Sequence, residues 1–364
     1  MIFGCFNYKL KLLNIVIIFV IFGFILYMEN EKTLLNIYGV VVSLSGNNEI
    51  INKLSSDFKY FLSDKDNSNT QIHLSININF TNPTYEKIPQ VCASMYKADC
   101  ICYDYNDLRY TDYNGNGLVI FDKKNKSAEI YSTDNDFLYE ISYLLLHSQV
   151  GELLDMNGYH RIHSCSFSYN NKTFICMLPQ GGGKSTLLMN LLKNNNIKLL
   201  SDDTPIINNN GDIYPFPIRI GVCNDFDTSD IDEKLISVFN RRKFGQKKLV
   251  SYEYFKDRIE KENLPKTIIL GKRVYSDTAM IIQTNRFCAF IELLKNCVIG
   301  YGLLQVIEYF LVGGFKDILK KTYIVFSRLY ACIWLVLKTK QVYYFYLSKN
   351  KDNNSSYFTE FFNR

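Results

Sequence analysis

Ile175-Cys-Met-Leu-Pro-Gln-Gly-Gly-Gly-Lys-Ser-Thr186 predicts a buried strand, a glycine-rich turn and the start of a helix, in that order. The apolar residues that open this segment suit the interior of a sheet. A helix that begins near Lys184 adds the positive end of its dipole. Three consecutive glycines let successive backbone N–H groups turn toward one anion, and these are Gly181, Gly182 and Gly183. The segment is therefore a candidate loop for binding phosphate groups.

The same segment matches the second half of the nucleotide-binding pattern G-x-x-x-x-G-K-[ST], in which the lysine reaches the β- and γ-phosphates and the next hydroxyl holds Mg²⁺. Lys184 and Ser185 occupy these two positions, and we expect Thr186 to join them in holding the phosphates. The pattern also has a glycine six residues before the lysine, where this chain has Leu178. ATP and Mg²⁺ are therefore the expected ligands. The alternative is a glycine-rich turn that only caps a core strand.

A pair of carboxylates follows the loop after one short helix. Asp202 and Asp203 come directly after Leu199 and Leu200, which predict a second strand. Ligands of open α/β sheets bind at the carboxyl ends of the strands. One carboxylate can complete the shell of Mg²⁺, and the other can accept a proton from an attacking hydroxyl. We assign the metal to Ser185 and Asp203 and keep both carboxylates as candidate bases, with a surface turn as the alternative.

The order of these parts resembles the HPr kinase/phosphorylase superfamily, whose members carry a P-loop, one helix, a strand that ends in two aspartates, and a short hairpin. Here the hairpin is Pro205-Ile-Ile-Asn-Asn-Asn-Gly-Asp-Ile-Tyr-Pro-Phe-Pro-Ile-Arg219. Upstream, Ile162-His-Ser-Cys-Ser-Phe167 is similar to the histidine-bearing strand of that family. The resemblance covers residues 151–222. No segment matches the glycine-rich region with which the family docks the HPr protein, so the acceptor stays open.

This resemblance implies a P-loop core of the HPr-kinase/PEP-carboxykinase kind. It implies transfer of the γ-phosphoryl group of ATP to a serine-like hydroxyl on a protein or peptide, and relatives act on ribosomally made precursor peptides. It also implies a place for His163 near the phosphates, as a catalytic residue beside Lys184 and the two aspartates. The alternative is a structural histidine on an apolar strand face. Members of the family often form hexamers, which implies a homo-oligomer.

The remaining pattern predicts an α/β chain of four parts. These are a hydrophobic segment at 1–28, an α/β lobe at 29–150, the P-loop core at 151–300, and a C-terminal helical region with a closing strand at 301–364. Expected strands lie at 36–44, 71–80, 117–121, 128–131, 267–270, 279–283 and 342–347, and expected helices at 49–62, 136–150, 285–297, 302–311 and 315–338. A polar, flexible segment is expected at 349–356.

Composition gives no indication of a nucleic-acid-binding protein or of a zinc-binding protein. The chain has 364 residues and a net charge of +5 that is spread along it, which is too weak to indicate a nucleic-acid partner. The ten cysteines show no zinc-ligand spacing. Free thiols and a nucleotide site both suit the reducing cytoplasm, where we place the protein.

Residues 12–28 form an apolar run at the short limit for a membrane span. Lys9 and Lys11 precede it and would keep the N-terminus inside, which would move a kinase away from its ATP. We therefore favour translation that begins at Met28 or a role that does not span the membrane. Membrane association through residues 12–28 is the other interpretation.

The sequence thus predicts a magnesium- and ATP-dependent serine kinase. Two rivals remain: a nucleotide-binding sensor or scaffold without turnover, and a membrane-tethered ATPase. Two basic features lie downstream of the acid pair. Arg219 could stabilise the transferring phosphate or be a surface arginine, and the run at 241–248 could close over phosphates, dock an acidic substrate or form a solvated loop.

Overall fold

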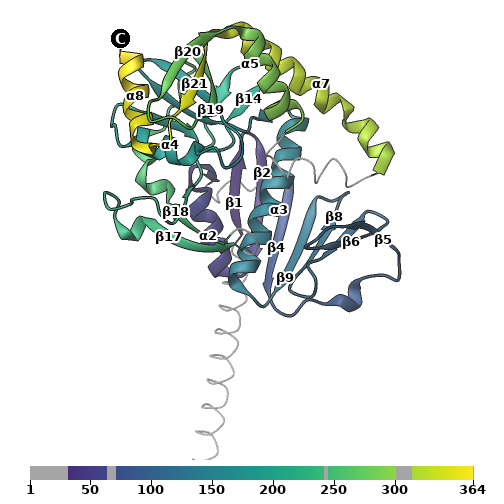
Figure 1. Cartoon of the computed structure of the whole chain (residues 1–364). Coiled ribbons are helices and arrows are strands. Elements are labelled where there is room, and N and C mark those ends of the chain that lie inside the picture. The colour runs from purple at the N-terminus through teal and green to yellow at the C-terminus, as the bar shows by residue number, and fades with distance from the viewer. Residues whose placement is uncertain (1–31, 64–70, 242–244, 301–313, 364) are drawn as a thin grey trace, which may run out of the picture. The chain divides into compact units, whose positions relative to one another are not determined.

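The computed structural model describes residues 32–63, 71–241, 245–300 and 314–363, which form a mixed α/β protein (Figure 1). The chain divides into two compact units. The first contains Val41–Asn52, Ser63–Leu138 and the described part of Met1–Leu35, and the second contains Asn36–Val40, Lys53–Leu62 and Tyr139–Arg364. Each unit has its own sheets.

A nine-stranded sheet accounts for most of the first unit, in the order β3-β1-β2-β4-β9-β8-β7-β6-β5. Strands β2, β4 and β9 are parallel, and the strands from β9 to β5 form an antiparallel meander. The strands are β1 (Thr33–Ile37), β2 (Val40–Gly46), β3 (Leu62–Ser63), β4 (Leu74–Phe80), β5 (Ala93–Tyr96), β6 (Ile101–Tyr105), β7 (Leu108–Asp112), β8 (Leu118–Asp122) and β9 (Ser127–Ser132). The helix α2 (Asn48–Asp57) follows β2, and short 3₁₀ helices lie at Lys59–Phe61 and Tyr85–Lys87.

The expectation of one strand at 36–44 was wrong, because the chain reverses inside it. Tyr38 and Gly39 both have left-handed backbone angles, with φ of 49° and 87°, and they separate β1 from β2. Left-handed geometry of this kind makes a tight turn that an apolar run does not reveal. The expected helix at 49–62 also ends earlier, at Asp57.

The second unit is built on a six-stranded sheet in the order β13-β11-β12-β19-β21-β20. Its central strands β12, β19 and β21 are parallel, whereas β11, β13 and β20 each run antiparallel to a neighbour. The bounds are β11 (Cys165–Tyr169), β12 (Lys172–Met177), β13 (Lys198–Ser201), β19 (Lys266–Arg273), β20 (Met280–Thr284) and β21 (Thr339–Leu347).

Two smaller sheets complete this unit. One has the order β10-β14-β15 and the other β16-β18-β17. Their strands are β10 (Tyr159–Arg161), β14 (Ile206–Asn208), β15 (Ile213–Tyr214), β16 (Ile220–Val222), β17 (Ile236–Arg241) and β18 (Gly245–Val250). Short 3₁₀ helices lie at Glu233–Leu235, Tyr252–Tyr254 and Lys256–Arg258. The basic run at 241–248 therefore belongs to a β-hairpin, at the end of β17 and the start of β18.

Helices cover both faces of the six-stranded sheet and form two cores (Figure 1). Helices α4 (Lys184–Leu192) and α8 (Lys351–Asn363) pack together against one face. Helices α5 (Arg286–Leu293) and α7 (Gly314–Lys338) pack together against the other, and a π-helical turn at Leu294–Val298 continues α5. Successive side chains of a strand point to opposite faces of the sheet. Since helices cover both faces of this sheet, its strands carry apolar side chains on both faces.

The expectation of a flexible segment at 349–356 was wrong, because this stretch begins α8. Asn354 accepts a hydrogen bond from the Ser348 backbone N–H at 2.8 Å and fixes the entry to the helix. Phe358 is fully buried, and its ring contacts the rings of Phe167 and Phe174. The first residues of the segment are polar and gave no sign of a helix, whereas the aromatic residues that pack against the core, such as Phe358, come later in the helix.

The helix α3 (Asn135–Met156) confirms the helix expected at 136–150 and extends it. The expected domain boundary at residue 150 falls inside this helix, whose residues from Tyr139 onward belong to the second unit. Tyr143 and His147 contact the ring of Phe58, and His147 also contacts Phe216, all within that unit.

Two expectations fall on other parts of the chain. The apolar run at 12–28 and the helix expected at 302–311 both lie outside the described residues. Within the described ranges, no helix combines the length and the apolar character that a membrane crossing requires.

Candidate active site

The glycine-rich turn joins β12 to α4. Gly181 and Gly183 have φ of 72° and 94°, in the left-handed region that favours glycine. Gly183 is the residue before the first turn of α4, so the helix N-terminus faces the turn. A Cβ on Gly182 would lie 2.8 Å from the Pro179 carbonyl oxygen, whereas a Cβ on Gly181 would meet nothing within 4 Å. The strand, turn and helix expected from the sequence are confirmed.

Leu178, which replaces the first glycine of the pattern, lies beneath the turn. It is 2% exposed and belongs to the core on the α4 side of the sheet. A Cβ on Gly271, in the neighbouring strand β19, would lie 2.4 Å from Leu178 Cγ. The missing side chain at Gly271 therefore makes the room that Leu178 occupies.

Lys184 is held by two acceptors. Its Nζ lies 2.6 Å from His163 Nε2 and donates to the Leu178 carbonyl oxygen at 3.2 Å. Because an ammonium group can only donate, His163 Nε2 must accept, and the proton of the neutral imidazole is then on Nδ1. That Nδ1 lies 3.9 Å from Asp203 Oδ1.

His163 is not on a strand, contrary to the expectation from its alternating neighbours. It lies between β10 and β11, where its backbone N–H donates to the Asn296 carbonyl oxygen at 2.9 Å. The side chain is buried and contacts the lysine of the glycine-rich loop. The structure therefore brings together Lys184, His163 and the acid pair, which the sequence places in three separate segments.

The two aspartates follow β13 and differ in their surroundings. Ser185 Oγ donates to Asp202 Oδ2 at 2.9 Å, and Asp202 Oδ1 is buried with no hydrogen-bond partner among the described residues. The side chain of Asp203 is 55% exposed, and its Oδ1 lies 3.9 Å from Lys184 Nζ. Thr186, on the first turn of α4, is half-buried.

Burial raises the pKa of Asp202 to about 6, and the charge of Asp203 adds to the increase. Lys247, the hydrogen bond from Ser185 and the charge of Lys184 oppose it. Asp202 is therefore an acid that titrates close to neutral pH.

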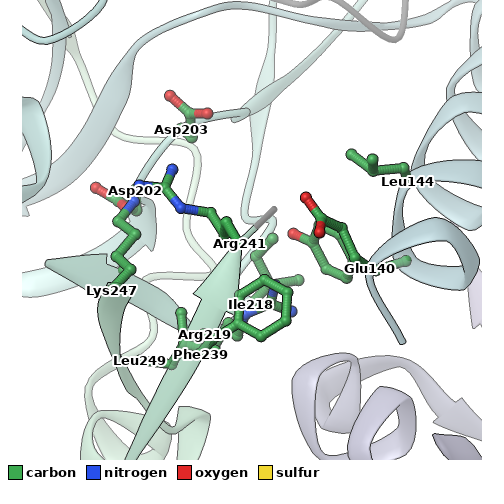
Figure 2. A pocket seen from close by; sticks show the side chains of 12 residues that line it. Glu140, Leu144, Asp202, Asp203, Ile218, Arg219, Phe239, Arg241, Lys247 and Leu249 are labelled. Carbon is green, nitrogen blue, oxygen red and sulfur yellow. The ribbon is translucent and has the colours of Figure 1, made fainter. Parts of the chain in front are cut away.

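A pocket of about 190 Å³ adjoins the acid pair (Figure 2). Helix α3, the end of β13 and the sheet β16-β18-β17 with the residues before it form its walls. The lining residues are Glu140, Tyr143, Leu144, Asp202, Asp203, Ile218, Arg219, Gly221, Phe239, Arg241, Lys247 and Leu249.

The structure adds Arg273, a cation that sequence reasoning missed, and it places two cations of the basic run at 241–248. Arg273 ends β19 beside the loop, and its Nη2 would lie 3.4 Å from a Cβ on Gly183. The sequence signal that could have predicted this position is a basic residue at the carboxyl end of β19, the strand that pairs with β12. Arg241 and Lys247 come from the hairpin and line the pocket. Arg219 is buried rather than on the surface, and its guanidinium pairs with Asp57.

The residues at the loop fit a magnesium–nucleotide complex. Within the described ranges, no group of three or more His, Cys, Asp or Glu side chains could hold a metal by itself. Mg²⁺ in nucleotide sites needs no such group, because one or two protein oxygens, the phosphates and water complete its shell. Ser185 Oγ and Asp202 can supply protein oxygens, and the orphaned Asp202 Oδ1 marks a buried acceptor without a donor.

No protein-family model matches the chain, and no curated protein sequence matches it.

Proposed function

We propose that the protein is a magnesium- and ATP-dependent kinase with an HPr-kinase-like core, which transfers the γ-phosphoryl group to a hydroxyl of a protein or peptide. One observation carries this proposal: the glycine-rich turn, Lys184 and the two aspartates form a single contact network. The Lys184–His163 contact of 2.6 Å and the Ser185–Asp202 bond of 2.9 Å link its two halves. A glycine-rich turn that only caps a core strand does not account for the buried Lys184 or for the buried Asp202 Oδ1 without a hydrogen-bond partner beside it.

The loop would bind the polyphosphate. Its backbone N–H groups and the N-terminus of α4 supply positive potential, and Lys184 adds a full charge. In the free protein the Lys184 ammonium contacts the Leu178 carbonyl and His163. On nucleotide binding it would exchange the carbonyl for phosphate oxygens, and His163 would remain as the residue that positions it.

Ser185 and Asp202 would hold Mg²⁺, which neutralises charge on the phosphates as they separate. This differs from the metal pair expected from the sequence, Ser185 and Asp203, and the reason is the direct bond between Ser185 and Asp202. Asp203 is then the base. Its side chain is exposed and lines the pocket in which an acceptor could lie.

The chemical step balances with these groups. The acceptor oxygen forms a bond to the γ-phosphorus, and the bond from that phosphorus to the β–γ bridging oxygen breaks, so ADP leaves with the electron pair. The acceptor proton passes to a carboxylate oxygen of Asp203. Positioning and charge neutralisation supply most of the catalysis, because the transition state of phosphoryl transfer is loose.

Transfer of label tests the proposal. The protein is incubated with γ-labelled ATP, Mg²⁺ and a library of serine-centred peptides. We expect labelled peptide that depends on both ATP and Mg²⁺. Tight ATP binding without labelled product would instead favour the nucleotide sensor, for which Leu178 in place of glycine is the supporting observation. Release of labelled phosphate alone would favour the ATPase.

A metal titration separates the roles of the two aspartates. Asp202→Asn should raise the Mg²⁺ concentration for half-maximal transfer by about 10- to 100-fold. Asp203→Asn should leave that concentration nearly unchanged and lower kcat by about 10²- to 10⁴-fold. The opposite pattern would return the metal to Asp203.

A further inference from the structure

The pocket beside the acid pair has a defined chemical character. Asp202 and Asp203 form the wall that it shares with the phosphate-binding loop. Apolar side chains form much of the remaining surface, and these are Leu144, Ile218, Phe239 and Leu249. A group that lies in the pocket therefore has the proposed base at one end and an apolar surface along its length.

Lys247 brings a positive charge to the acid wall. It extends from β18 across Gly221, where a Cβ would lie 2.5 Å from Lys247 Cε and 2.6 Å from Nζ. Gly221 thus leaves the space through which the lysine enters the pocket. Lys247 forms no salt bridge with a carboxylate of the described residues. Figure 2 shows Lys247 and Arg241 reaching toward Asp202 from the hairpin, with Glu140 and Leu144 on the facing helix.

Arg219, another cation of the pocket lining, is already neutralised. Arg219 pairs with Asp57, and its guanidinium carbon lies 3.9 Å from the centre of the Tyr143 ring. Tyr139 donates a hydrogen bond to the same carboxylate at 2.5 Å. A ligand would have to displace Asp57 to reach this arginine, so Arg219 forms a fixed part of the wall. Lys247 lines the pocket without such a carboxylate partner among the described residues and can meet a ligand.

We propose that the pocket binds the acceptor as a hydroxyl-bearing peptide residue with a carboxylate side chain next to it, and that Lys247 binds this carboxylate. The assignment rests on the proposed kinase function and names its substrate class. A carboxylate at Lys247 would place the neighbouring hydroxyl at Asp203, because both residues line the same small pocket. A charge-assisted hydrogen bond in such a partly buried place discriminates strongly against neutral and basic side chains.

Paired peptides test this assignment. The wild-type protein, with ATP and Mg²⁺, is given serine peptides that carry Glu, Gln or Lys at either neighbouring position. We expect kcat/KM to be about 10- to 100-fold higher for the Glu peptides. Lys247→Glu should reverse the preference toward the Lys peptides. Gly221→Ala, which displaces the lysine without removing its charge, should reduce the preference.

Lys248 provides the matched control. It is the next residue of β18, but its Nζ donates to the Phe226 carbonyl oxygen at 3.0 Å and it does not line the pocket. Lys248→Gln should keep the preference for Glu peptides. Equal transfer to all three peptides by the wild type would overturn the assignment and leave the kinase function standing. If neither these three peptides nor any other serine peptide is labelled, both the assignment of Lys247 and the kinase function are overturned.

Discussion

Two polar clusters in the second unit use similar residues and differ in how completely they are bonded. One is the open cluster, defined as Lys184, His163, Asp202 and Asp203. The other is the closed cluster, defined as Asp155, His160, Arg328, Ser327 and Asn209. Their histidines stand three positions apart, on either side of the end of β10.

The polar side chains of the closed cluster all have hydrogen-bond partners. His160 Nδ1 lies 2.8 Å from Asp155 Oδ1, and its Nε2 lies 2.9 Å from Ser327 Oγ. These distances alone would suit a serine hydrolase, but Arg328 also donates to both oxygens of Asp155, and Ser327 lies within α7. The cluster therefore ties α3 to α7, and the hydrogen-bonding groups of Asp155 and His160 are already occupied.

In and beside the open cluster, in contrast, buried polar atoms lack hydrogen-bond partners among the described residues. Asp202 Oδ1 and the nearby hydroxyls of Ser164 and Thr204 are buried and have no hydrogen-bond partner among the described residues. Such atoms cost free energy in the free protein. The comparison teaches that residue types and short distances do not separate the two clusters, whereas the unbonded buried atoms do, and these atoms support the proposed ligand site.

The largest expected effect is on activity at the open cluster. Lys184→Ala should lower transfer to the best serine peptide by about 10³-fold, because it removes a charge aimed at the phosphates. The free energy of unfolding should change little, since the variant also removes a buried charge. Radiolabel transfer and urea unfolding measure the two effects. Lys193→Ala is the control, because this lysine ends α4 and pairs with Asp230 at the surface. An equal loss in both variants would contradict the assignment of Lys184.

The next effect is on stability at the closed cluster. Arg328→Met should lower the free energy of unfolding by about 3–5 kcal/mol, because it leaves the carboxylate of Asp155 buried without its cation. Urea unfolding at pH 7 measures this. A second change, Asp155→Leu in the same chain, should recover part of the loss, since no unpaired charge then remains. Full stability of Arg328→Met would show that the ion pair contributes nothing.

The closed cluster also sets a pH dependence. Burial by itself would raise the pKa of Asp155, but Arg328 and the bond from His160 hold that pKa well below its ordinary value. A carboxyl group whose pKa is lower in the folded state stabilises the fold when the pH is above its pKa in the unfolded state. This contribution is lost as the pH falls below that pKa. The stability difference between wild type and Arg328→Met should therefore shrink below about pH 4.

At the open cluster the pH dependence of stability has the opposite sign, because the pKa of Asp202 is raised in the folded protein. The pKa of Asp202 is raised to about 6, so the unfolded chain loses this proton first as the pH rises, and stability is lost between the two pKa values. Asp202→Asn should thus stabilise the free protein by about 1–3 kcal/mol at pH 7.5 and by much less at pH 4. Thermal unfolding at the two pH values, without nucleotide or Mg²⁺, measures the difference. Destabilisation at pH 7.5 would place Asp202 among structural carboxylates.

Sequence patterns predicted the open cluster better than the closed one. Lys184, Ser185 and the acid pair follow a local spacing, and the chain order of strand, loop, helix and strand places them together. The contact of His163 with Lys184 depends on a loop between two strands, which periodicity cannot give. The pairing of Arg219 with Asp57 spans 162 positions and left no local pattern.

The same limit applies to the fold. The parallel strands β12, β19 and β21 were visible as apolar runs, but the turn at Tyr38-Gly39 was not, because tyrosine rarely marks a left-handed backbone. The helix α8 was missed because its first residues are polar and its packing face consists of later aromatic residues. Local composition therefore failed where long-range packing decided the structure.

The smallest expected effect is the coupling energy between two residues beneath the open cluster, Leu178 and Gly271. Gly271→Ala would place a Cβ 2.4 Å from Leu178 Cγ, and overpacking of this kind costs about 1–3 kcal/mol. Leu178→Ala in the wild-type background should cost about 2–5 kcal/mol, because a buried leucine leaves a cavity. In the double variant the alanine methyl group at 271 partly fills that cavity, so the summed costs should exceed the measured one. A double-mutant cycle by urea unfolding gives the coupling, which we expect to be about 0.5–3 kcal/mol. Additive costs would mean that Leu178 and Gly271 do not share this space, and that the loop holds its shape without the leucine beneath it.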